Sequence, residues 1–341
     1  MTKEQINSLL AKGEFPDPSG QRELIETHIS WVIISDEFVY KIKKPIQYSF
    51  LDFSTLALRK HFCEREIDLN KRLTDNIYVD VQAIYECQGR FTIGGNEGTI
   101  IEYAVRMNKL DKEKQMDVLL LKNNVTETDI RNLAEKIAFF HKNTTVIYNK
   151  DFLDIQKKFN DLGTEKEFLG QQLGNDSNNI VSRAIESSDI FIKKHKELLA
   201  TRLRAGFFRD CHGDLHSRNI FLLPAPQPFD CLEFNDDFRQ IDVLNEVAFL
   251  CMDLDAFGKQ DLSALFIDHY NHLFPAMITE GDKSLFIYYK SYRANIRAKV
   301  NSLRARSAEN TADKTKALSE ASKYLGLMAA YLQSLDLLHY I

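Results

Sequence analysis

The segment CHGDLHSRNIFL (211–222) carries side chains whose types and spacing suit phosphoryl transfer. Asp214 stands five residues before Asn219, and an apolar run follows directly. Phosphoryl transfer needs a carboxylate that orients the acceptor hydroxyl and accepts its proton, and a second group that holds magnesium. Asp214 fits the first role and Asn219 the second. The plain alternative is a turn in which Asp214 only caps the backbone.

Two acids downstream compete to be the second magnesium ligand. Asp230 lies 11 residues beyond Asn219 and Glu233 lies 14 beyond. If this segment is a strand, alternation points the two side chains to opposite faces, so only one is expected to bind the metal directly. A site shared by both acids is the other option. We favour Glu233.

The form HGDLHxxN resembles the aminoglycoside phosphotransferase and choline kinase group of the protein-kinase-like family more than the protein kinases, whose loop reads HRDxxxxN. The resemblance spans nearly the whole chain, through THISWV, VYKIKKP, FLDFSTL, REIDLN, EYAVRM and DCLEFNDDFRQIDVLNEVAFLCMDLD. It points to an uncharacterised bacterial branch whose longer members carry a C-terminal P-loop kinase-like domain, although this sequence has no GxxxxGK(S/T). The context CLEF is similar to the family's IDF or IDW, but with glutamate in place of aspartate.

The resemblance implies an ATP- and magnesium-dependent kinase that phosphorylates a hydroxyl of a small molecule. Lys41 in FVYKIKKP resembles the lysine that contacts nucleotide phosphates, and Lys43 is the fallback. In the following helix Glu66 is expected to pair with Lys41 and orient it. Glu64 is the less favoured partner.

Two further nucleotide contacts are expected from the backbone. The segment before the first strand pair contains no GxGxxG, which argues against a protein kinase. Amides near residues 28–30, with the Ser30 hydroxyl, are expected to cap a phosphate instead. In IIEYAVRM, which resembles a strand leading into the interlobe hinge, the backbone of Glu102, Tyr103 and Ala104 is expected to bind adenine.

The acceptor side is predicted from one helix. Tyr289, Arg293 and Arg297 recur every four residues and form one stripe, which suits an acidic, phosphorylated or hydroxyl-rich acceptor better than a polycationic aminoglycoside. An amphipathic surface helix explains the stripe equally well. Four other polar residues are expected to be structural: His212, His216, Asp242 and Glu246.

The elements that must position these residues form an α+β, two-lobed, protein-kinase-like fold. Five antiparallel strands are predicted over 30–35, 37–43, 79–86, 91–93 and 99–107. One helix with Ser54 as its candidate N-cap lies between the two hairpins. We expect an N-terminal nucleotide-binding lobe over 1–107, with its hinge near 102–107, and a mainly helical catalytic and acceptor-binding lobe over 108–341.

Composition limits the possible functions. The formal net charge of -5 does not suggest a protein built to neutralise nucleic acid. No run approaches 18 consecutive apolar residues, so we expect a cytoplasmic protein with no membrane contact. The partner that the resemblance implies is a small molecule. The five cysteines include no CxxC pair and are expected to be free, buried thiols.

Two alternatives to a small-molecule kinase stay open. The missing glycine loop and the glutamate at the metal position are also compatible with a nucleotide-binding pseudokinase that acts as a regulatory module. A kinase or AMP-transferase that acts on a protein side chain would use the same residues. ATP binding without turnover would indicate the first, and a phosphate or AMP adduct on a protein would indicate the second.

Overall fold

The structure is a computed structural model that describes residues 1–17 and 20–335. Its contacts divide the chain into two units, Met1–Leu119 with Arg218–Phe238, and Leu120–Ser217 with Arg239–Ile341. The predicted division after residue 107 differs because the chain returns to the first unit at 218–238. There Gln227 accepts a hydrogen bond from the Asp75 amide at 2.7 Å, and Asp230 pairs with Lys41.

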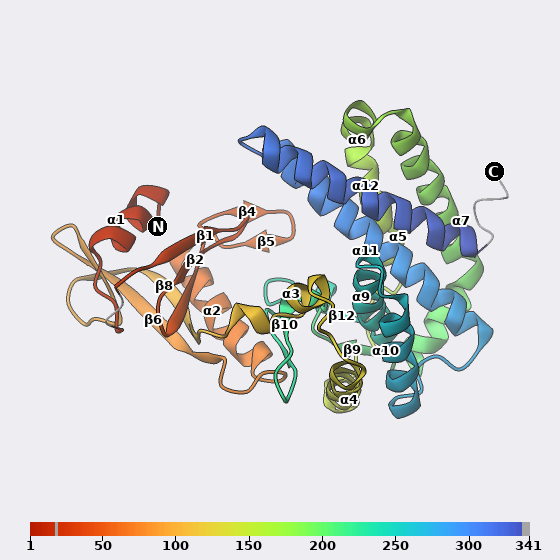
Figure 1. Ribbon diagram of the computed structural model, residues 1–341, viewed down its shortest axis with the longest axis horizontal. Helices are drawn as coiled ribbons and strands as arrows, with labels where there is room; N and C mark the ends of the chain where they lie inside the picture. The colour runs from red at the N-terminus through yellow and green to blue at the C-terminus, as the bar shows by residue number, and fades with distance from the viewer. Residues whose placement is uncertain (18–19, 336–341) are drawn as a thin grey trace. The chain divides into compact units, whose positions relative to one another are not determined.

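The first unit contains an antiparallel sheet in the order β1-β2-β3-β8-β6-β7 (Figure 1). Its strands are β1 (Glu23–Glu26), β2 (Ser30–Ile34), β3 (Phe38–Lys43), β6 (Tyr78–Cys87), β7 (Arg90–Ile93) and β8 (Thr99–Asn108). The predicted count of five strands is wrong, because β1 also pairs with β2. The sequence of β1, ELIE, is short, largely exposed and half acidic, so it lacks the usual hydrophobic signal of a strand.

Two helices pack on this sheet instead of the single one predicted. Helix α1 (Lys3–Lys12) begins with a capping box at Thr2 and buries Ile6 and Leu9 in the core of the sheet. Helix α2 (Leu56–Asn70) packs against β8 and β6. Its N-cap is Thr55, rather than the predicted Ser54, because the Thr55 side chain accepts the Leu58 amide.

The remaining elements associated with this unit are short. They are the strand pairs β4 (Gln47–Tyr48) with β5 (Leu51–Asp52) and β10 (Ile220–Phe221) with β11 (Gln227–Pro228), the 3₁₀ turns Lys112–Lys114 and Ser217–Asn219, and the helices α3 (Met116–Leu121) and α8 (Asp236–Arg239). The β10–β11 hairpin begins in the apolar run that directly follows Asn219.

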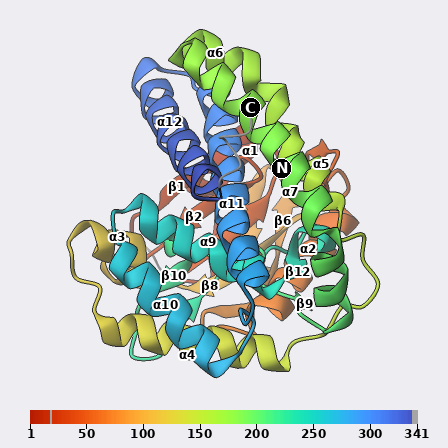
Figure 2. The same ribbon diagram turned by 90° about the vertical axis from the view of Figure 1, so that its right-hand side faces the viewer.

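The second unit is mainly helical, as predicted. Its helices are α4 (Glu127–Asn143), α5 (Asp154–Asn160), α6 (Lys166–Leu173), α7 (Asn175–Arg204), α9 (Val243–Ala256), α10 (Gln260–Leu273), α11 (Glu280–Ser307) and α12 (Thr311–Ser334). It also holds the 3₁₀ turn Asp161–Glu165 and the paired strands β9 (Phe208–Asp210) and β12 (Gln240–Asp242). Helix α9 is buried on all sides and packs against α10 and α11, and α11 runs along α12 (Figure 2).

The described residues also test the expectations on cysteine and membranes. All five cysteines are free, and only Cys87 is exposed, so the prediction of buried thiols is confirmed for the other four. Within residues 1–17 and 20–335, no helix has both the length and the hydrophobicity that a membrane span requires.

Candidate active site

In the first unit, two lysines of β3 share one glutamate of α2. Lys41 and Lys43 are two residues apart and therefore project from the same face of the strand. Nζ of Lys41 lies 2.8 Å from Glu66 Oε1, and Nζ of Lys43 lies 2.7 Å from Glu66 Oε2. Glu66 is fully buried on the face of α2 that packs against the sheet. The predicted pair between Lys41 and Glu66 is present, and Lys43 joins it.

The same lysines reach the two acids that compete for the metal position. Lys41 Nζ lies 2.5 Å from Asp230 Oδ1, while Lys43 donates to Glu233. The side chain of Asp230 is 42% exposed, whereas that of Glu233 is only 4% exposed. A metal ligand needs an accessible oxygen. This difference in exposure therefore favours Asp230 as the metal ligand, whereas the sequence had led us to favour Glu233.

The backbone at Asp230 explains why strand alternation does not apply here. Asp230 has a φ of 61°, a left-handed conformation that aspartate tolerates better than most residues, and it lies outside any strand. Its amide donates to the Tyr78 hydroxyl at 3.1 Å, and the next amide, of Cys231, donates to Asn70 Oδ1 at 2.8 Å. Because this segment is not a strand, the expectation that the two acids face opposite ways does not apply, and both acids join one network.

Electrostatics fix the charges in this network. Burial alone would lower the pKa of Lys41, but Asp230 and Glu66 outweigh it and raise that pKa well above its usual value. Burial likewise opposes ionisation of Glu66, but Lys41 and Lys43 hold its pKa below the usual range. For Glu233, burial dominates and raises the pKa. At neutral pH the network therefore contains two ammonium groups around an ionised Glu66.

The β10–β11 hairpin brings the backbone of the predicted amide ligand, Asn219, near the backbone of Asp230. Asn219 directly precedes β10, and Phe229 directly follows β11. The Phe229 amide donates to the Asn219 carbonyl at 2.9 Å, which places Asn219 beside the residue that precedes Asp230. The first unit thus joins Lys41, Glu66 and Asp230 in one network, with Asn219 tied to the adjoining backbone.

In the second unit, Asp214 lies on a loop with its side chain 41% exposed. His216 Nε2 is 3.3 Å from Asp214 Oδ2, and His212 Nδ1 accepts the Asp214 amide at 3.2 Å. Burial would raise the pKa of Asp214, but His216, Arg297 and His212 hold it well below its usual range. The carboxylate is therefore ionised at neutral pH, and both histidines fix the loop, in line with the structural role expected for them.

Buried side chains of α9 and α11 hold the backbone of this loop in place. Glu246 of α9 accepts the amides of His212 at 2.6 Å and Gly213 at 3.0 Å, and burial raises its pKa to about 7 although Arg293 opposes this. Arg293 of α11 donates to the Gly213 carbonyl at 3.2 Å and to Asn245 Oδ1 at 2.7 Å. Gly213 has a φ of 91°, so a residue with a side chain would strain the loop.

Asp242 is structural, as predicted, and lies at the start of α9. Its carboxylate accepts the Leu244 amide at 2.9 Å and so caps α9. It also accepts two hydrogen bonds from Arg202, at 2.6 and 2.9 Å. Arg202 reaches Asp282 at 2.6 Å as well, which ties the start of α9 to the start of α11.

The stripe Tyr289, Arg293 and Arg297 does not lie on a surface helix, because α11 buries all three residues. Tyr289 donates to Asp242 at 3.5 Å, and Arg293 holds the loop, so neither is available for an acceptor. Arg297 differs, because its buried Nε has no hydrogen-bond partner. For Arg297 the predicted substrate role stays a prediction.

Ser30 conflicts with its predicted contact with phosphate. Its side chain is fully buried, and its hydroxyl has no partner. Its amide donates to Thr27 Oγ1 at 2.9 Å, and its carbonyl accepts from the Thr27 hydroxyl at 3.0 Å. These bonds close the turn between β1 and β2, which sequence reasoning missed because β1 has no hydrophobic signal.

The predicted adenine contact at Glu102, Tyr103 and Ala104 conflicts with their place in the sheet. All three pair with β6 across the β6–β8 ladder, and Ala104 also pairs with Ile42 of β3. The Glu102 side chain is buried and bound to Arg59 at 2.8 Å. Strand β8 runs from Thr99 to Asn108, one residue beyond the predicted end, and the hinge near 102–107 stays a prediction.

Comparisons with known proteins agree with this architecture. No family model matches the sequence. An uncharacterized protein of Mycobacterium tuberculosis is 28% identical over 316 residues, which cover 90% of this chain and 59% of that protein. The chain therefore spans about three fifths of the length of the curated relatives it matches.

Two solved structures share the fold. A candidate aminoglycoside phosphotransferase of Ralstonia eutropha matches with a TM-score of 0.51 and 12% identity, covering 98% of each chain. The GDP complex of a variant aminoglycoside 2′-phosphotransferase-IIIa matches with a TM-score of 0.56 and 13% identity, covering 96% of this chain and 97% of the other. At this identity the likeness establishes the fold, and the fold predicted from the sequence is confirmed.

Proposed function

We propose that this chain, which has the fold of the aminoglycoside phosphotransferases, transfers the γ-phosphoryl group of ATP to a hydroxyl of a small molecule. The observation that carries this proposal is the cluster in the first unit, where Lys41 contacts both Glu66 and Asp230 and the hairpin brings Asn219 alongside. A lysine oriented by a glutamate, next to an amide and a carboxylate, is the donor set that phosphoryl transfer uses.

These residues fit a magnesium nucleotide. Asn219 and Asp230 offer the oxygen donors that magnesium prefers, and Lys41 carries a permanent positive charge for the phosphates. When bound, magnesium would neutralise charge that develops on the transferred group. Glu233 instead serves as an ion-pair partner of Lys43, since the two side chains are buried together. With Asp230 as the metal ligand, a glutamate at the metal position is no longer an argument for a pseudokinase.

Asp214 is proposed as the catalytic base. Its ionised carboxylate orients the acceptor hydroxyl and takes the proton as the oxygen bonds to the γ-phosphorus. The bond between that phosphorus and the bridging oxygen breaks, and ADP leaves. Glu246, Arg293 and Gly213 keep the loop in shape without taking part in the reaction.

Arg297 supports an acceptor with an anionic group. Its guanidinium is buried, its Nε lacks a hydrogen-bond partner, and Asp214 is one of the groups that act on its pKa. Burial would lower the pKa of Arg297, but Tyr324, Asp253 and Asp214 raise it. A phosphate or carboxylate on the acceptor would supply the missing partner in a charge-assisted bond.

Transfer of label from γ-labelled ATP, with magnesium, into a bacterial metabolite extract tests this function. Because the solved relative holds GDP, γ-labelled GTP is run in parallel. We expect a labelled small molecule with the wild type and roughly a 10²–10⁴-fold slower reaction with Asp214→Asn. Nucleotide binding without transfer would support a pseudokinase, and label or AMP on a protein would support a protein substrate; either outcome overturns the proposal.

A further inference from the structure

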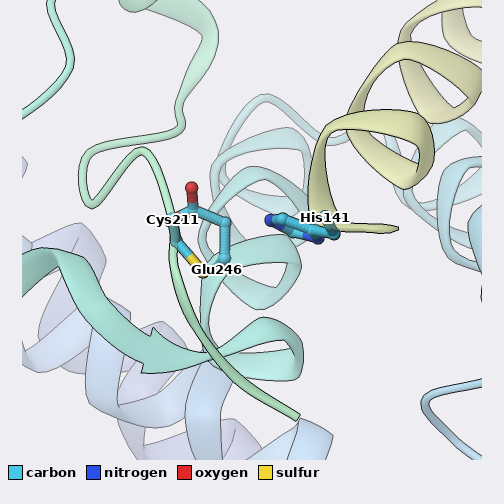
Figure 3. A group of neighbouring side chains, drawn as sticks. All are labelled: His141, Cys211 and Glu246. Carbon is cyan, nitrogen blue, oxygen red and sulfur yellow. The ribbon is translucent and has the colours of Figure 1, made fainter. Parts of the chain in front are cut away.

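Three buried side chains of different chemistry meet beneath the HGD loop. His141 belongs to α4, Glu246 to α9, and Cys211 to the segment that follows β9 (Figure 3). All three are fully buried in the second unit. One donor atom from each, an imidazole nitrogen, the thiol sulfur and a carboxylate oxygen, lies within 4.8 Å of the other two.

His141 has a nitrogen that nothing in the described part of the chain satisfies. Its Nδ1 lies 2.7 Å from the Tyr270 hydroxyl, while its Nε2 is buried and has no hydrogen-bond partner. Figure 3 shows the ring directed toward Cys211 and Glu246. Burial, with Arg209 adding to it, lowers the pKa of His141 to about 3, so the ring is neutral. A buried polar atom without a partner costs about 1–3 kcal/mol, which calls for an explanation.

We propose that His141, Cys211 and Glu246 bind one zinc ion. Neutral imidazole, thiolate and carboxylate are all ligands of zinc, and the thiolate disfavours magnesium and calcium. The tyrosine hydroxyl on Nδ1 fixes the ring and directs the lone pair of Nε2 toward the ion, as the hydrogen-bond partner of a metal-binding histidine commonly does.

The contacts already made by the other two ligands are compatible with an ion. Glu246 accepts two amides, which use only part of the about four lone-pair positions of a carboxylate. Cys211 has a long contact of 3.6 Å with the Ile241 carbonyl. When zinc binds, the S–H bond breaks, the proton goes to solvent and the sulfur bonds to the ion, so this contact is given up.

Geometry requires a small contraction. Ligand bonds of about 2.0–2.3 Å to a tetrahedral ion place the donor atoms about 3.5 Å apart, so a cluster spanning up to 4.8 Å must close by roughly 1 Å. Rotation of the Cys211 and Glu246 side chains can supply that movement. The ion would then connect α4 and α9 to Cys211, which immediately precedes His212 of the loop.

Zinc titration of metal-free protein, in competition with a chromophoric chelator, tests the site. We expect one zinc per chain, and a thiolate-to-metal charge-transfer band when cobalt replaces zinc. Cys211→Ser should weaken zinc binding more than about 100-fold, since loss of a ligand's hydrogen-bond partner alone costs about 10–100-fold. Tyr270→Phe should fall within that lower range.

Two variants serve as controls. Cys251→Ser removes a buried thiol that lies on α9 and outside the cluster. Asp214→Asn removes the proposed base. Both variants should bind zinc like the wild type. The zinc site does not depend on the proposed reaction, so transfer can fail while zinc binds. Any of three results overturns the site. These are wild-type protein that binds less than one zinc per chain, a cobalt spectrum without the thiolate band, or an unchanged zinc affinity in Cys211→Ser. If Cys211→Ser does not fold, the wild-type stoichiometry and cobalt spectrum still decide.

Discussion

Lys41 and Lys43, two positions apart on β3, have different roles in the first unit. Lys41 is 13% exposed and contacts the exposed Asp230, while Lys43 is fully buried between Glu66 and Glu233. A charge that is partly accessible can bind a phosphate, whereas a fully buried one is committed to its partners. The proposed function therefore assigns nucleotide binding to Lys41 and structural support to Lys43.

Methionine substitutions separate these duties. Lys41→Met should lower ATP affinity by about tenfold or more, since a charge-assisted bond to phosphate contributes about 1.5–3 kcal/mol. Lys43→Met should instead lower the free energy of unfolding by roughly 3–5 kcal/mol, because Glu233 is left buried and unpaired. Calorimetric titration with ATP and denaturant unfolding of both variants measure this, and equal losses of affinity in the two would refute the division.

The sequence predicted part of this residue pattern and missed the rest for a physical reason. The Lys41–Glu66 pair could be predicted, because the lysine lies on a predicted strand and the glutamate on the helix that follows it. The choice between Asp230 and Glu233 depends on a φ of 61°, which is held by Tyr78 and Asn70 from distant parts of the chain. No local pattern around Asp230 contains that information.

At the scale of elements, the β1–β2 hairpin turns without a glycine. Thr27 closes its turn through bonds with the amide and carbonyl of Ser30, so this turn needs no glycine. The buried Ser30 hydroxyl has no hydrogen-bond partner, and a buried polar group without a partner lowers stability.

Alanine substitutions test this view of the hairpin. Thr27→Ala should lower the free energy of unfolding by about 0.5–1.5 kcal/mol, because the bonds that close the turn are lost. Ser30→Ala should leave unfolding and ATP affinity unchanged or slightly improved, since no bond is removed. Unfolding curves and ATP titrations of both variants check this. A clear loss of ATP affinity in Ser30→Ala would restore the phosphate contact first predicted for Ser30.

A second element, the start of α11, gives a pH dependence. In the capping box at the start of α11, the Asp282 carboxylate accepts the Thr279 amide at 2.9 Å, and it also accepts a bond from Arg202; burial opposes its ionisation, but these bonds outweigh it and lower its pKa. A carboxyl whose pKa is lower in the folded state stabilises the protein above its unfolded pKa of about 3.9, and this contribution is lost as pH falls through the folded pKa.

Asp282→Asn should therefore lower the free energy of unfolding by roughly 1.5–3 kcal/mol at pH 7. The difference from the wild type should shrink as the pH is taken below about 4, where the unfolded chain takes up the proton, and it should disappear below the lowered folded pKa, where Asp282 is protonated in both states. Denaturant unfolding across this range measures it. Glu280→Gln, a change at an exposed residue of the same first turn, should leave unfolding nearly unchanged. A pH-independent difference for Asp282→Asn would contradict the assignment.

At the scale of the whole chain, hydrophobic periodicity was enough for the fold class. Strand alternation before residue 107 and helical periodicity after Thr126 predicted a β-rich first part and a helical second part. Periodicity could not show that 218–238 rejoins the first unit, because that depends on pairs such as Lys41–Asp230, nearly two hundred residues apart. Nor could it show that the Tyr289 stripe is buried, since α9 and α12 cover α11 from other parts of the sequence.

The central claim is that the first unit holds a magnesium nucleotide through Asp230. The most direct test is ATP affinity with and without magnesium for the wild type, Asp230→Asn and Glu233→Gln. Asparagine also tolerates a positive φ, so Asp230→Asn removes the charge while keeping the backbone. Magnesium should strengthen ATP binding at least about tenfold, or 1.4 kcal/mol, in the wild type and in Glu233→Gln, and have no effect in Asp230→Asn. An undiminished magnesium effect in Asp230→Asn would contradict the claim.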